Sequence, residues 1–382
     1  MADFVFRISP NIVLGSYSSS RTGQFVREWG SRFLLVADPV LSEFGITEKT
    51  VQSLKDYNID CVIFDEISSN SDTALVEQAL KLARDARVHG LITIGGMKIS
   101  NTGKIVCALF DEKKTVYDFM EGAAFGEKAL PCICIPTTVS NEFLFTDKAP
   151  IIDARTGQLK MLRFQPGLCR LVVSDPNLIV SLTENQFMAM ILRAVCITVE
   201  AYVSQKANFF SDTIIEKAAE LLGYVLSETP ALMTATPKEQ LAMEGGCMAA
   251  LGAASASSGA ATLLSHAVNA RCKVSPALTA AILLPHIIED AATVKEDRLA
   301  KLARILNVAG ENSSNDTAVG LFAEAVRSKI AQFNLPARLK DVSVSLEQLA
   351  LCIDDVGKLD VTPEFHRSMT EDDLFDIVKY AF

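Results

Sequence analysis

The first half of the chain alternates short apolar runs with segments whose apolar residues recur at helical spacing. Apolar runs bounded by polar turns predict buried strands over residues 32–38, 61–67, 90–96 and 128–138. Helical spacing over residues 73–89 predicts a helix between two of these strands. Because strands and helices alternate across short connections, we expect a parallel, Rossmann-like sheet with helices on its faces. Residues 151–164 predict a hairpin that turns at 155–157.

The pattern changes near residue 180. From there to the end of the chain, long stretches rich in Ala, Leu and Met replace the strand-like runs. The stretch 248–268 is dense in small residues and predicts a helix buried on all sides of a bundle. The sequence therefore predicts an α/β domain over residues 1–179 and an all-α domain over residues 180–382, with a cleft between them. A chain of 382 residues is long enough for two such cores.

Composition narrows the class of protein. The net charge of −10 and the absence of a Lys/Arg run argue against nucleic acid as a partner. The chain has no signal-peptide pattern at its start and no uninterrupted apolar run of about 18 residues, so we expect no membrane-spanning helix. Nine scattered cysteines predict free thiols and a cytoplasmic location. Cys132 and Cys134 alternate along a predicted strand, which favours core packing over a metal site.

A few polar and glycine residues follow the predicted strands and suit a nucleotide. Asp38 ends the first strong strand, where a carboxylate can bind a ribose, although it could equally open a turn. Gly95 and Gly96 separate a strand from a helix and would let backbone N–H groups approach a pyrophosphate. Thr137 and Thr138 follow another strand and suit phosphate or ribose, or simply satisfy a turn. Each signal is weak alone, because the glycine spacing matches no established phosphate-binding motif.

Two other residues raise questions of chemistry. Arg193 is a lone cation among apolar neighbours in a predicted helix, and a buried charge needs a partner or a function. His266 lies in a small-residue helix, which makes it the histidine best placed for proton transfer. A hydrogen-bonded core histidine is the alternative for His266.

Several segments, taken in order, resemble the iron-containing (group III) alcohol dehydrogenase family, whose wider superfamily includes glycerol dehydrogenase and dehydroquinate synthase. They are GLITIGGMKISNTGK (90–104), CICIPTTVSNEFLFT (132–146), RLVVSDPNLIVSL (170–182), ITVEAYVS (197–204) and TAAILLPH (279–286). The resemblance covers nearly the whole chain. It implies the dehydroquinate synthase-like fold of a dinucleotide-binding domain and a helical domain, with NAD or NADP as cofactor, a small-molecule substrate and a homodimer as the assembly.

The resemblance also implies cofactor contacts. Asp38 corresponds to the acid that binds the adenosine ribose, which favours NAD over NADP. The other positions implied to contact the cofactor are Asn70, Gly95, Gly96, Thr137, Thr138, Thr146 and, near the nicotinamide end, Lys160. Two loops depart from the family pattern: Met97 and Lys98 replace a glycine and a serine, and Ser140 and Glu142 replace glycines. We expect Lys98 to offer the phosphates a compensating positive charge.

The family's metal ligands, an aspartate and three histidines, correspond here to Arg193, Ile197, Thr262 and Ala277. None is a ligand of the expected kind, so no divalent metal is expected. A divalent ion with one bound carboxylate has a net charge of about +1, and so does a guanidinium. Arg193 could therefore polarise a carbonyl or clamp a carboxylate in place of the metal. The structural alternative is an ion pair with Glu200 or Asp147.

Three functions remain open. The first is an NAD(P)-dependent oxidoreductase that reduces a small aldehyde or ketone, or oxidises an alcohol, without metal and with an anionic substrate as one option. In it, Arg193 stabilises the developing alkoxide and His266 relays the proton. The second is a catalytically inactive relative with a nucleotide-binding or regulatory role. The third, a dehydroquinate synthase-like lyase, is weaker because that chemistry depends on the missing metal.

Overall fold

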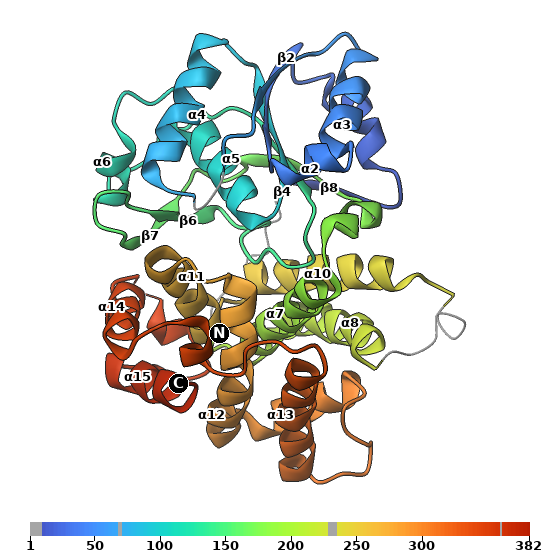
Figure 1. Ribbon diagram of the computed structural model, residues 1–382, viewed down its shortest axis with the longest axis vertical. Coiled ribbons are helices and arrows are strands. Elements are labelled where there is room, and N and C mark those ends of the chain that lie inside the picture. The colour runs from blue at the N-terminus through green and yellow to red at the C-terminus, as the bar shows by residue number, and fades with distance from the viewer. Residues whose placement is uncertain (1–9, 68–70, 228–234, 360) are drawn as a thin grey trace. The chain divides into compact units, whose positions relative to one another are not determined.

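The computed structural model describes residues 10–67, 71–227, 235–359 and 361–382, which belong to two compact units (Figure 1). The first unit takes in the chain to Thr138 together with Phe143–Thr156 and Lys160–Ser181. The second unit contains Leu182–Phe382 and two earlier segments, Val139–Glu142 and Gly157–Leu159. The sequence analysis drew a single boundary between residues 179 and 180. The structure adds that two short segments on the N-terminal side of the boundary belong to the helical unit.

The first unit is built on a six-stranded parallel sheet, which confirms the predicted fold class. Its strands run in the order β1-β8-β5-β4-β2-β3, and every measured pairing is parallel. They are β1 (Asn11–Leu14), β2 (Arg32–Ala37), β3 (Asp60–Phe64), β4 (Gly90–Gly95), β5 (Cys132–Pro136) and β8 (Cys169–Ser174). The predicted hairpin is a separate two-stranded sheet of β6 (Lys148–Ile152) and β7 (Leu159–Arg163).

Both faces of the six-stranded sheet are covered by helices. The helices of this unit are α1 (Thr22–Val26), α2 (Val40–Glu43), α3 (Ile46–Lys55), α4 (Thr73–Asp85), α5 (Met97–Leu109) and α6 (Val116–Met120), with short 3₁₀ helices η1 (Ser19–Arg21) and η2 (Pro176–Ser181). Phe33 and Leu35 of β2 pack with residues of α1, α2 and α3 in one buried cluster. On the other face α5 lies so close to β4 that a Cβ at Gly103 would be 2.1 Å from the Thr93 methyl group.

The second unit is helical, as predicted. Its helices are α7 (Glu184–Val203), α8 (Phe209–Leu226), α10 (Lys238–Ser255), α11 (Ala260–Cys272), α12 (Pro276–Ile305), α13 (Asn315–Gln332), α14 (Leu346–Gly357) and α15 (Glu371–Tyr380), with 3₁₀ helices η3 (Leu339–Val342) and η4 (Thr362–Glu364). The prediction of one buried helix over 248–268 is wrong in one respect. The segment is broken between α10 and α11, which are bent by 103°. Gly259 is the N-cap of α11, and a side chain is excluded there because a Cβ would lie 2.5 Å from the Glu200 carboxyl carbon.

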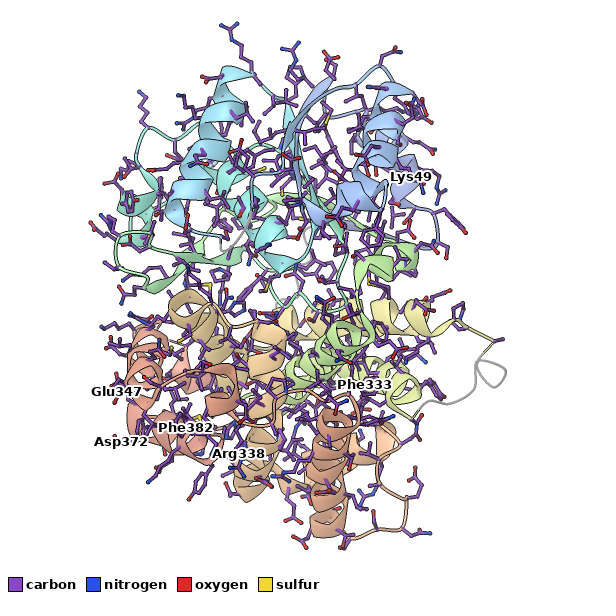
Figure 2. The ribbon with its side chains drawn as sticks, in the orientation of Figure 1. Lys49, Phe333, Arg338, Glu347, Asp372 and Phe382 are labelled. Atoms are coloured by element: carbon purple, nitrogen blue, oxygen red, sulfur yellow. The ribbon has the colours of Figure 1, made fainter. Side chains whose placement is uncertain are left out.

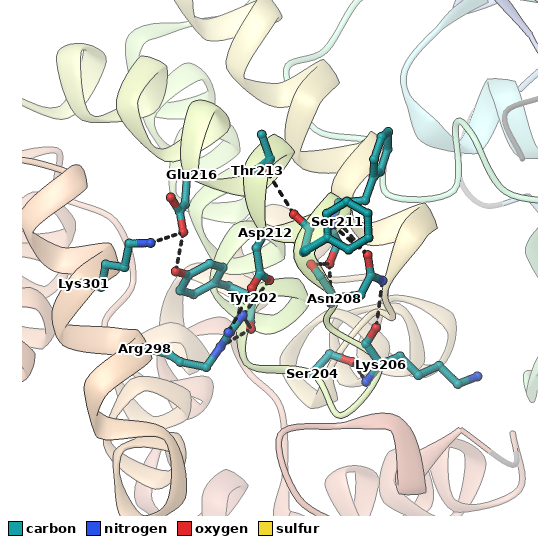
Figure 3. A network of polar contacts seen from close by, with 12 residues as sticks. Tyr202, Ser204, Lys206, Asn208, Ser211, Asp212, Thr213, Glu216, Arg298 and Lys301 are labelled. Atoms are coloured by element: carbon teal, nitrogen blue, oxygen red, sulfur yellow. Dashed lines mark hydrogen bonds and ion pairs between the residues drawn. The ribbon is translucent and has the colours of Figure 1, made fainter. Parts of the chain in front are cut away.

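Polar contacts anchor the C-terminal end of α7 to two neighbouring helices (Figure 3). Arg298 of α12 donates to the Asp212 carboxylate of α8 at 2.6 Å and to the carbonyl oxygen of Tyr202 at 2.5 Å. The Tyr202 hydroxyl donates to Glu216 of α8 at 2.7 Å, and Lys301 of α12 contacts the same carboxylate oxygen. Since α7 also carries Arg193, this network helps to fix the axial position of that residue.

Apolar helices account for much of the second unit. Among the described residues, α7 and α12 are long and apolar enough to cross a membrane by length and composition, although no uninterrupted apolar run had suggested it. Within the folded protein, 83% of the apolar window of α7 and 61% of that of α12 are buried. Charged side chains such as Lys49, Glu347 and Asp372 are exposed instead (Figure 2). All nine cysteines lie among the described residues and none forms a disulfide, and Cys132 and Cys134 are buried on β5 as predicted.

One glycine of α10 allows the segment Val139–Glu142 to lie against the helix. A Cβ at Gly246 would lie 1.8 Å from the carbonyl oxygen of Val139. We therefore predict that Gly246→Ala lowers the free energy of unfolding by about 1–3 kcal/mol, because either the helix or the segment must move. Denaturant unfolding followed by circular dichroism measures this change.

Gly320 is the matched control, because it also lies inside a helix, α13, but is exposed with open space around its Cα. Gly320→Ala should raise the free energy of unfolding by about 0.5–1 kcal/mol, the difference in helix propensity. Equal effects of the two substitutions would show that the close approach at Gly246 is not a real constraint.

Candidate functional site

The sheet of the first unit gathers most of the predicted nucleotide-binding residues at one edge. The carboxyl ends of the parallel strands β2, β4 and β5 meet there. Backbone hydrogen bonds join the residues that follow these strands. The Asp38 N–H donates to the Ile94 carbonyl oxygen at 3.0 Å, and the Thr137 N–H donates to that of Gly95 at 3.1 Å. The predicted residues brought together at this edge are Asp38, Gly95, Gly96, Thr137 and Thr138.

The turn between β4 and α5 requires glycine. Gly95 has a φ of +156°, and a Cβ there would lie 2.6 Å from the Ile99 side chain and 3.2 Å from Cβ of Asp38. Gly96 is the N-cap of α5 and uses no side chain to cap it. This cradle presents backbone N–H groups at a helix N-terminus beside a half-buried carboxylate. The residues fit a dinucleotide, with the turn suited to the pyrophosphate and Asp38 suited to a ribose.

The remaining predicted cofactor residues lie in other parts of the first unit. Lys98 is in the first turn of α5 and is half-buried. Lys160 is a half-buried residue of β7. The hydroxyl of Thr146 lies 3.1 Å from the carbonyl oxygen of Phe143 and 3.2 Å from that of Lys148, so it stabilises its own loop. Asn70 falls outside the described residues.

A buried lysine holds the loop that carries Thr146. The Lys104 ammonium group donates to the carbonyl oxygens of Phe143 at 2.7 Å, Thr146 at 2.6 Å and Lys148 at 2.9 Å. Burial lowers the pKa of Lys104, and three acceptors match its three donors. The sequence analysis gave Lys104 no role, and its place in the structure is to fix the chain that follows Glu142.

The second unit brings together three ionisable side chains that are far apart in the sequence: Glu142, Arg193 and His266, called here the triad. Arg193 Nη2 lies 2.7 Å and 3.0 Å from the two carboxylate oxygens of Glu142. His266 Nε2 forms a short contact with Oε1 of Glu142 and lies 3.2 Å from Arg193 Nη2. The exposed fractions are 0% for Glu142, 4% for Arg193 and 5% for His266, so the triad is desolvated.

The triad has a defined distribution of charge. Burial alone would raise the pKa of the Glu142 carboxyl, but Arg193 and then His266 outweigh it and lower that pKa to about 2. Burial lowers the pKa of His266, although the Glu142 charge opposes the shift. An ionised carboxylate can only accept, so the imidazole nitrogen in short contact with it, Nε2, carries the proton, and the 3.2 Å approach of Arg193 Nη2 to the same nitrogen is then not a hydrogen bond. Nδ1 is therefore the ring nitrogen with the lone pair.

Glu200, one of the acids considered as a partner of Arg193, has a different role. Its carboxylate accepts hydrogen bonds from the backbone N–H groups of Gly259 at 3.2 Å, Ala261 at 2.6 Å and Thr262 at 3.2 Å. Glu200 thus caps the N-terminus of α11. Burial raises its pKa to about 7, against the lowering effect of Thr262 and of those backbone groups. Asp147, the other acid considered, belongs to the first unit.

The positions that correspond to the family's metal ligands do not fit a divalent metal. Ile197 and Ala277 have no donor atom, and both are buried. Arg193 offers only N–H groups, which cannot ligate a cation, and its guanidinium already lies against Glu142. Thr262 supplies a single hydroxyl, whereas iron and zinc sites use three or four N, O or S ligands.

Glu142 is the site residue that the sequence analysis missed. It was treated only as a side chain that replaces a glycine in a loop. One signal could have identified it: a buried arginine requires a carboxylate, and this loop acquires one where the family pattern has none. Arg193 and His266 were both selected from sequence, and the structure brings them to the same carboxylate.

Two family models match the chain, one after the other. The model for "Iron-containing alcohol dehydrogenase" matches residues 9–176. The model for "Fe-containing alcohol dehydrogenase family, C-terminal" matches residues 188–382. Together they account for nearly the whole sequence, and each coincides with most of one structural unit.

Individual proteins are similar over the same length. The NAD-dependent methanol dehydrogenase of Bacillus methanolicus is 22% identical, with 98% of this chain and 99% of that protein covered. The 1,3-propanediol dehydrogenase of Citrobacter freundii is 22% identical over 82% of each chain. Among solved structures, a 1,3-propanediol oxidoreductase matches all of both chains with a TM-score of 0.90 at 20% identity. The NADH-dependent butanol dehydrogenase A of Thermotoga maritima matches 100% of this chain and 99% of that one, with a TM-score of 0.85 at 20% identity.

The two buried glutamates predict opposite dependences of stability on pH. The folded pKa of Glu142 lies below its usual 4.5, so its contribution is present above pH 4.5 and is lost as the pH falls toward 2. The folded pKa of Glu200 lies above 4.5, so its contribution is present below pH 4.5 and is lost as the pH rises through 7. Each change amounts to something on the order of 3 kcal/mol.

The measurement is the free energy of unfolding from pH 2 to pH 8 for the wild type, Glu142→Gln and Glu200→Gln. Glu142→Gln should flatten the profile below pH 4.5, and Glu200→Gln should flatten it between pH 4.5 and 7. The slope is the readout, because Glu142→Gln also destabilises the protein at every pH by leaving Arg193 without its carboxylate. Parallel profiles for all three proteins would refute the assignment of these charges.

Proposed function

This chain belongs to the iron-containing alcohol dehydrogenase family, and we propose that it is an oxidoreductase of that family whose centre works without a divalent metal. The reaction is the interconversion of a small aldehyde or ketone with the corresponding alcohol, with NAD(H) or NADP(H) as the hydride acceptor or donor. The buried triad carries this proposal. At the position of a metal-binding carboxylate the chain has a guanidinium, and it supplies Glu142 to hold it.

Dinucleotide binding is supported by the cradle of the first unit. The turn at Gly95 and Gly96 suits the pyrophosphate, and Thr137 and Thr138 offer hydroxyl groups at the next strand end. Asp38 suits a free ribose and repels a 2′-phosphate, which favours NAD over NADP. When bound, the nicotinamide supplies or accepts the hydride. Relatives named as NAD-dependent methanol dehydrogenase and NADH-dependent butanol dehydrogenase A agree with this choice.

In this proposal His266 is the residue that transfers the proton. Because its Nε2–H is directed at Glu142, protonation changes at Nδ1. During carbonyl reduction His266 returns a proton to the developing alkoxide, and during alcohol oxidation it accepts one. Arg193 is the N–H donor that stabilises the charge on that oxygen. Glu142 orients both groups and stabilises the imidazolium when it forms, as a carboxylate does in other histidine dyads.

The substrate is a small aldehyde, ketone or alcohol, in keeping with relatives named for methanol, 1,3-propanediol and butanol. We expect the enzyme to act in the cytoplasm and as a homodimer, with neither nucleic acid nor membrane as a partner. These expectations follow from the composition and from the family.

We predict that chelation leaves activity unchanged. After dialysis against EDTA and bipyridyl, the purified protein should oxidise NADH with an aldehyde panel at its original rate, and added Fe²⁺ or Zn²⁺ should not raise that rate. Metal analysis of the same sample is the second measurement. Stoichiometric metal whose removal abolishes turnover would overturn the metal-free centre. No turnover, together with no thermal shift by either nucleotide, would favour a non-catalytic role.

His266→Gln should lower kcat by about 10²–10⁴-fold, because the amide can still donate to Glu142 but cannot exchange a proton. Steady-state reduction of the best aldehyde measures this effect. His286→Gln is the matched control, since His286 lies on α12 beside Glu289 and has no place in the triad. Equal activity of the two variants would remove His266 from the proton path.

Asp38→Ala should weaken NAD binding by about tenfold or more, because losing a hydrogen bond to a charged group usually lowers the affinity by that factor. NADP binding should weaken less or improve, because the carboxylate no longer repels the 2′-phosphate. Titration of intrinsic fluorescence with each nucleotide measures the ratio. Asp60→Ala, at the amino end of β3, is the control and should leave both affinities unchanged. An unaltered NAD to NADP ratio in Asp38→Ala would place the ribose elsewhere.

A further inference from the structure

We propose that Glu142 is a specificity-determining residue that cancels the charge of Arg193, so that the centre takes uncharged aldehydes and ketones and rejects carboxylated ones. The inference rests on the proposed function and names its substrate class. It replaces the option of an anionic substrate, which followed from the idea that Arg193 presents an uncompensated positive charge.

The first argument is geometric. Both carboxylate oxygens of Glu142 lie within 3.0 Å of the same guanidinium nitrogen of Arg193, and no part of the Glu142 side chain reaches solvent. A clamp for a substrate carboxylate needs its guanidinium fork open to the ligand. Here both Glu142 oxygens share Nη2 of that fork, so the chain itself places a negative charge directly against the guanidinium.

The second argument is a sum of charges. Glu142 contributes −1, Arg193 contributes +1 and the neutral imidazole of His266 contributes nothing, so the triad is neutral. Glu200, seven residues after Arg193 on α7, adds no positive charge in either of its protonation states. A divalent metal with one carboxylate would instead leave about +1. An anionic substrate would thus lose its water without gaining an opposite net charge, which is unfavourable in a buried site.

The loop that carries Glu142 is built to keep it there. Val139 lies against Gly246 of α10 at a distance that admits no Cβ, which fixes the chain three residues before Glu142. The carboxylate then contacts α7 through Arg193 and α11 through His266. A group held from two helices is poorly able to move aside for a substrate carboxylate. The fold therefore keeps the negative charge of Glu142 next to Arg193.

The test uses two four-carbon aldehydes, butyraldehyde and succinic semialdehyde, which differ in a methyl group replaced by a carboxylate. The wild type should show a kcat/KM for butyraldehyde at least about tenfold above that for succinic semialdehyde, since leaving one charge unpaired costs that much or more. Glu142→Gln should shift this ratio at least about tenfold toward succinic semialdehyde, because Arg193 is then uncompensated.

Two further variants separate charge from damage to the fold. Glu142→Asp keeps the negative charge and should keep the preference for butyraldehyde even if kcat falls. The double variant Glu142→Gln/Arg193→Gln is neutral without an ion pair and should not gain activity toward succinic semialdehyde. Butyrate serves as a binding probe that needs no turnover: it should raise the Tm of Glu142→Gln and leave the Tm of the wild type and the double variant unchanged.

The outcomes distinguish this inference from the proposed function. If the wild type reduces no carbonyl compound but butyrate raises the Tm of Glu142→Gln alone, the proposed oxidoreductase fails while the charge assignment holds. If the wild type is active and prefers succinic semialdehyde, or if butyrate raises its Tm as much as that of Glu142→Gln, the inference is overturned while the oxidoreductase stands. The wild-type preference needs no variant, so failure of Glu142→Gln to fold does not prevent the test.

Discussion

The helical unit depends on one electrostatic constraint: a guanidinium in the middle of α7 must have a carboxylate. Arg193 and Glu142 are 51 residues apart in the sequence, and both are removed from water. An isolated charge at this depth would cost several kcal/mol, whereas the pair is tolerable because each group satisfies the other. The segment Val139–Glu142 consequently belongs to the helical unit, although it directly follows a strand of the sheet.

In the proposed function, the same constraint also governs the chemistry of the centre. A metal site polarises oxygen with a cation that is only partly neutralised by its ligands. The triad of this chain instead combines a neutralised guanidinium with an imidazole whose tautomer is fixed by the shared carboxylate. In the mechanism that we propose, such a centre donates hydrogen bonds and exchanges a proton, and we infer that it has no net charge to attract an anion. Family membership supplies the reaction class, while the proposal assigns to these three side chains the course of the reaction and the choice of carbonyl compound.

The helical unit contains two buried glutamates on which burial acts with different results. Glu142 has a cation beside it, and its pKa is low. Glu200 has only backbone N–H groups at the start of α11, and burial raises its pKa. Both are removed from water, so the difference comes from their partners. Glu142 pairs with the charge of Arg193, and Glu200 caps the N-terminus of α11, directly after the break from α10.

The sequence by itself determined the parallel sheet and the helical second half, and it selected the glycine turn with Asp38, Arg193 and His266 as candidate site residues. These features are local, because the period of apolar residues reports strands and helices, and an isolated charge or glycine stands out against its neighbours. Only the tertiary structure decided the partner of Arg193, the break at Gly259 and the assignment of 139–142 to the helical unit. Each of these depends on a contact between residues more than 50 positions apart, such as Glu142 with Arg193 or Glu200 with Gly259. No local pattern contains such a contact, since only folding brings the two residues together.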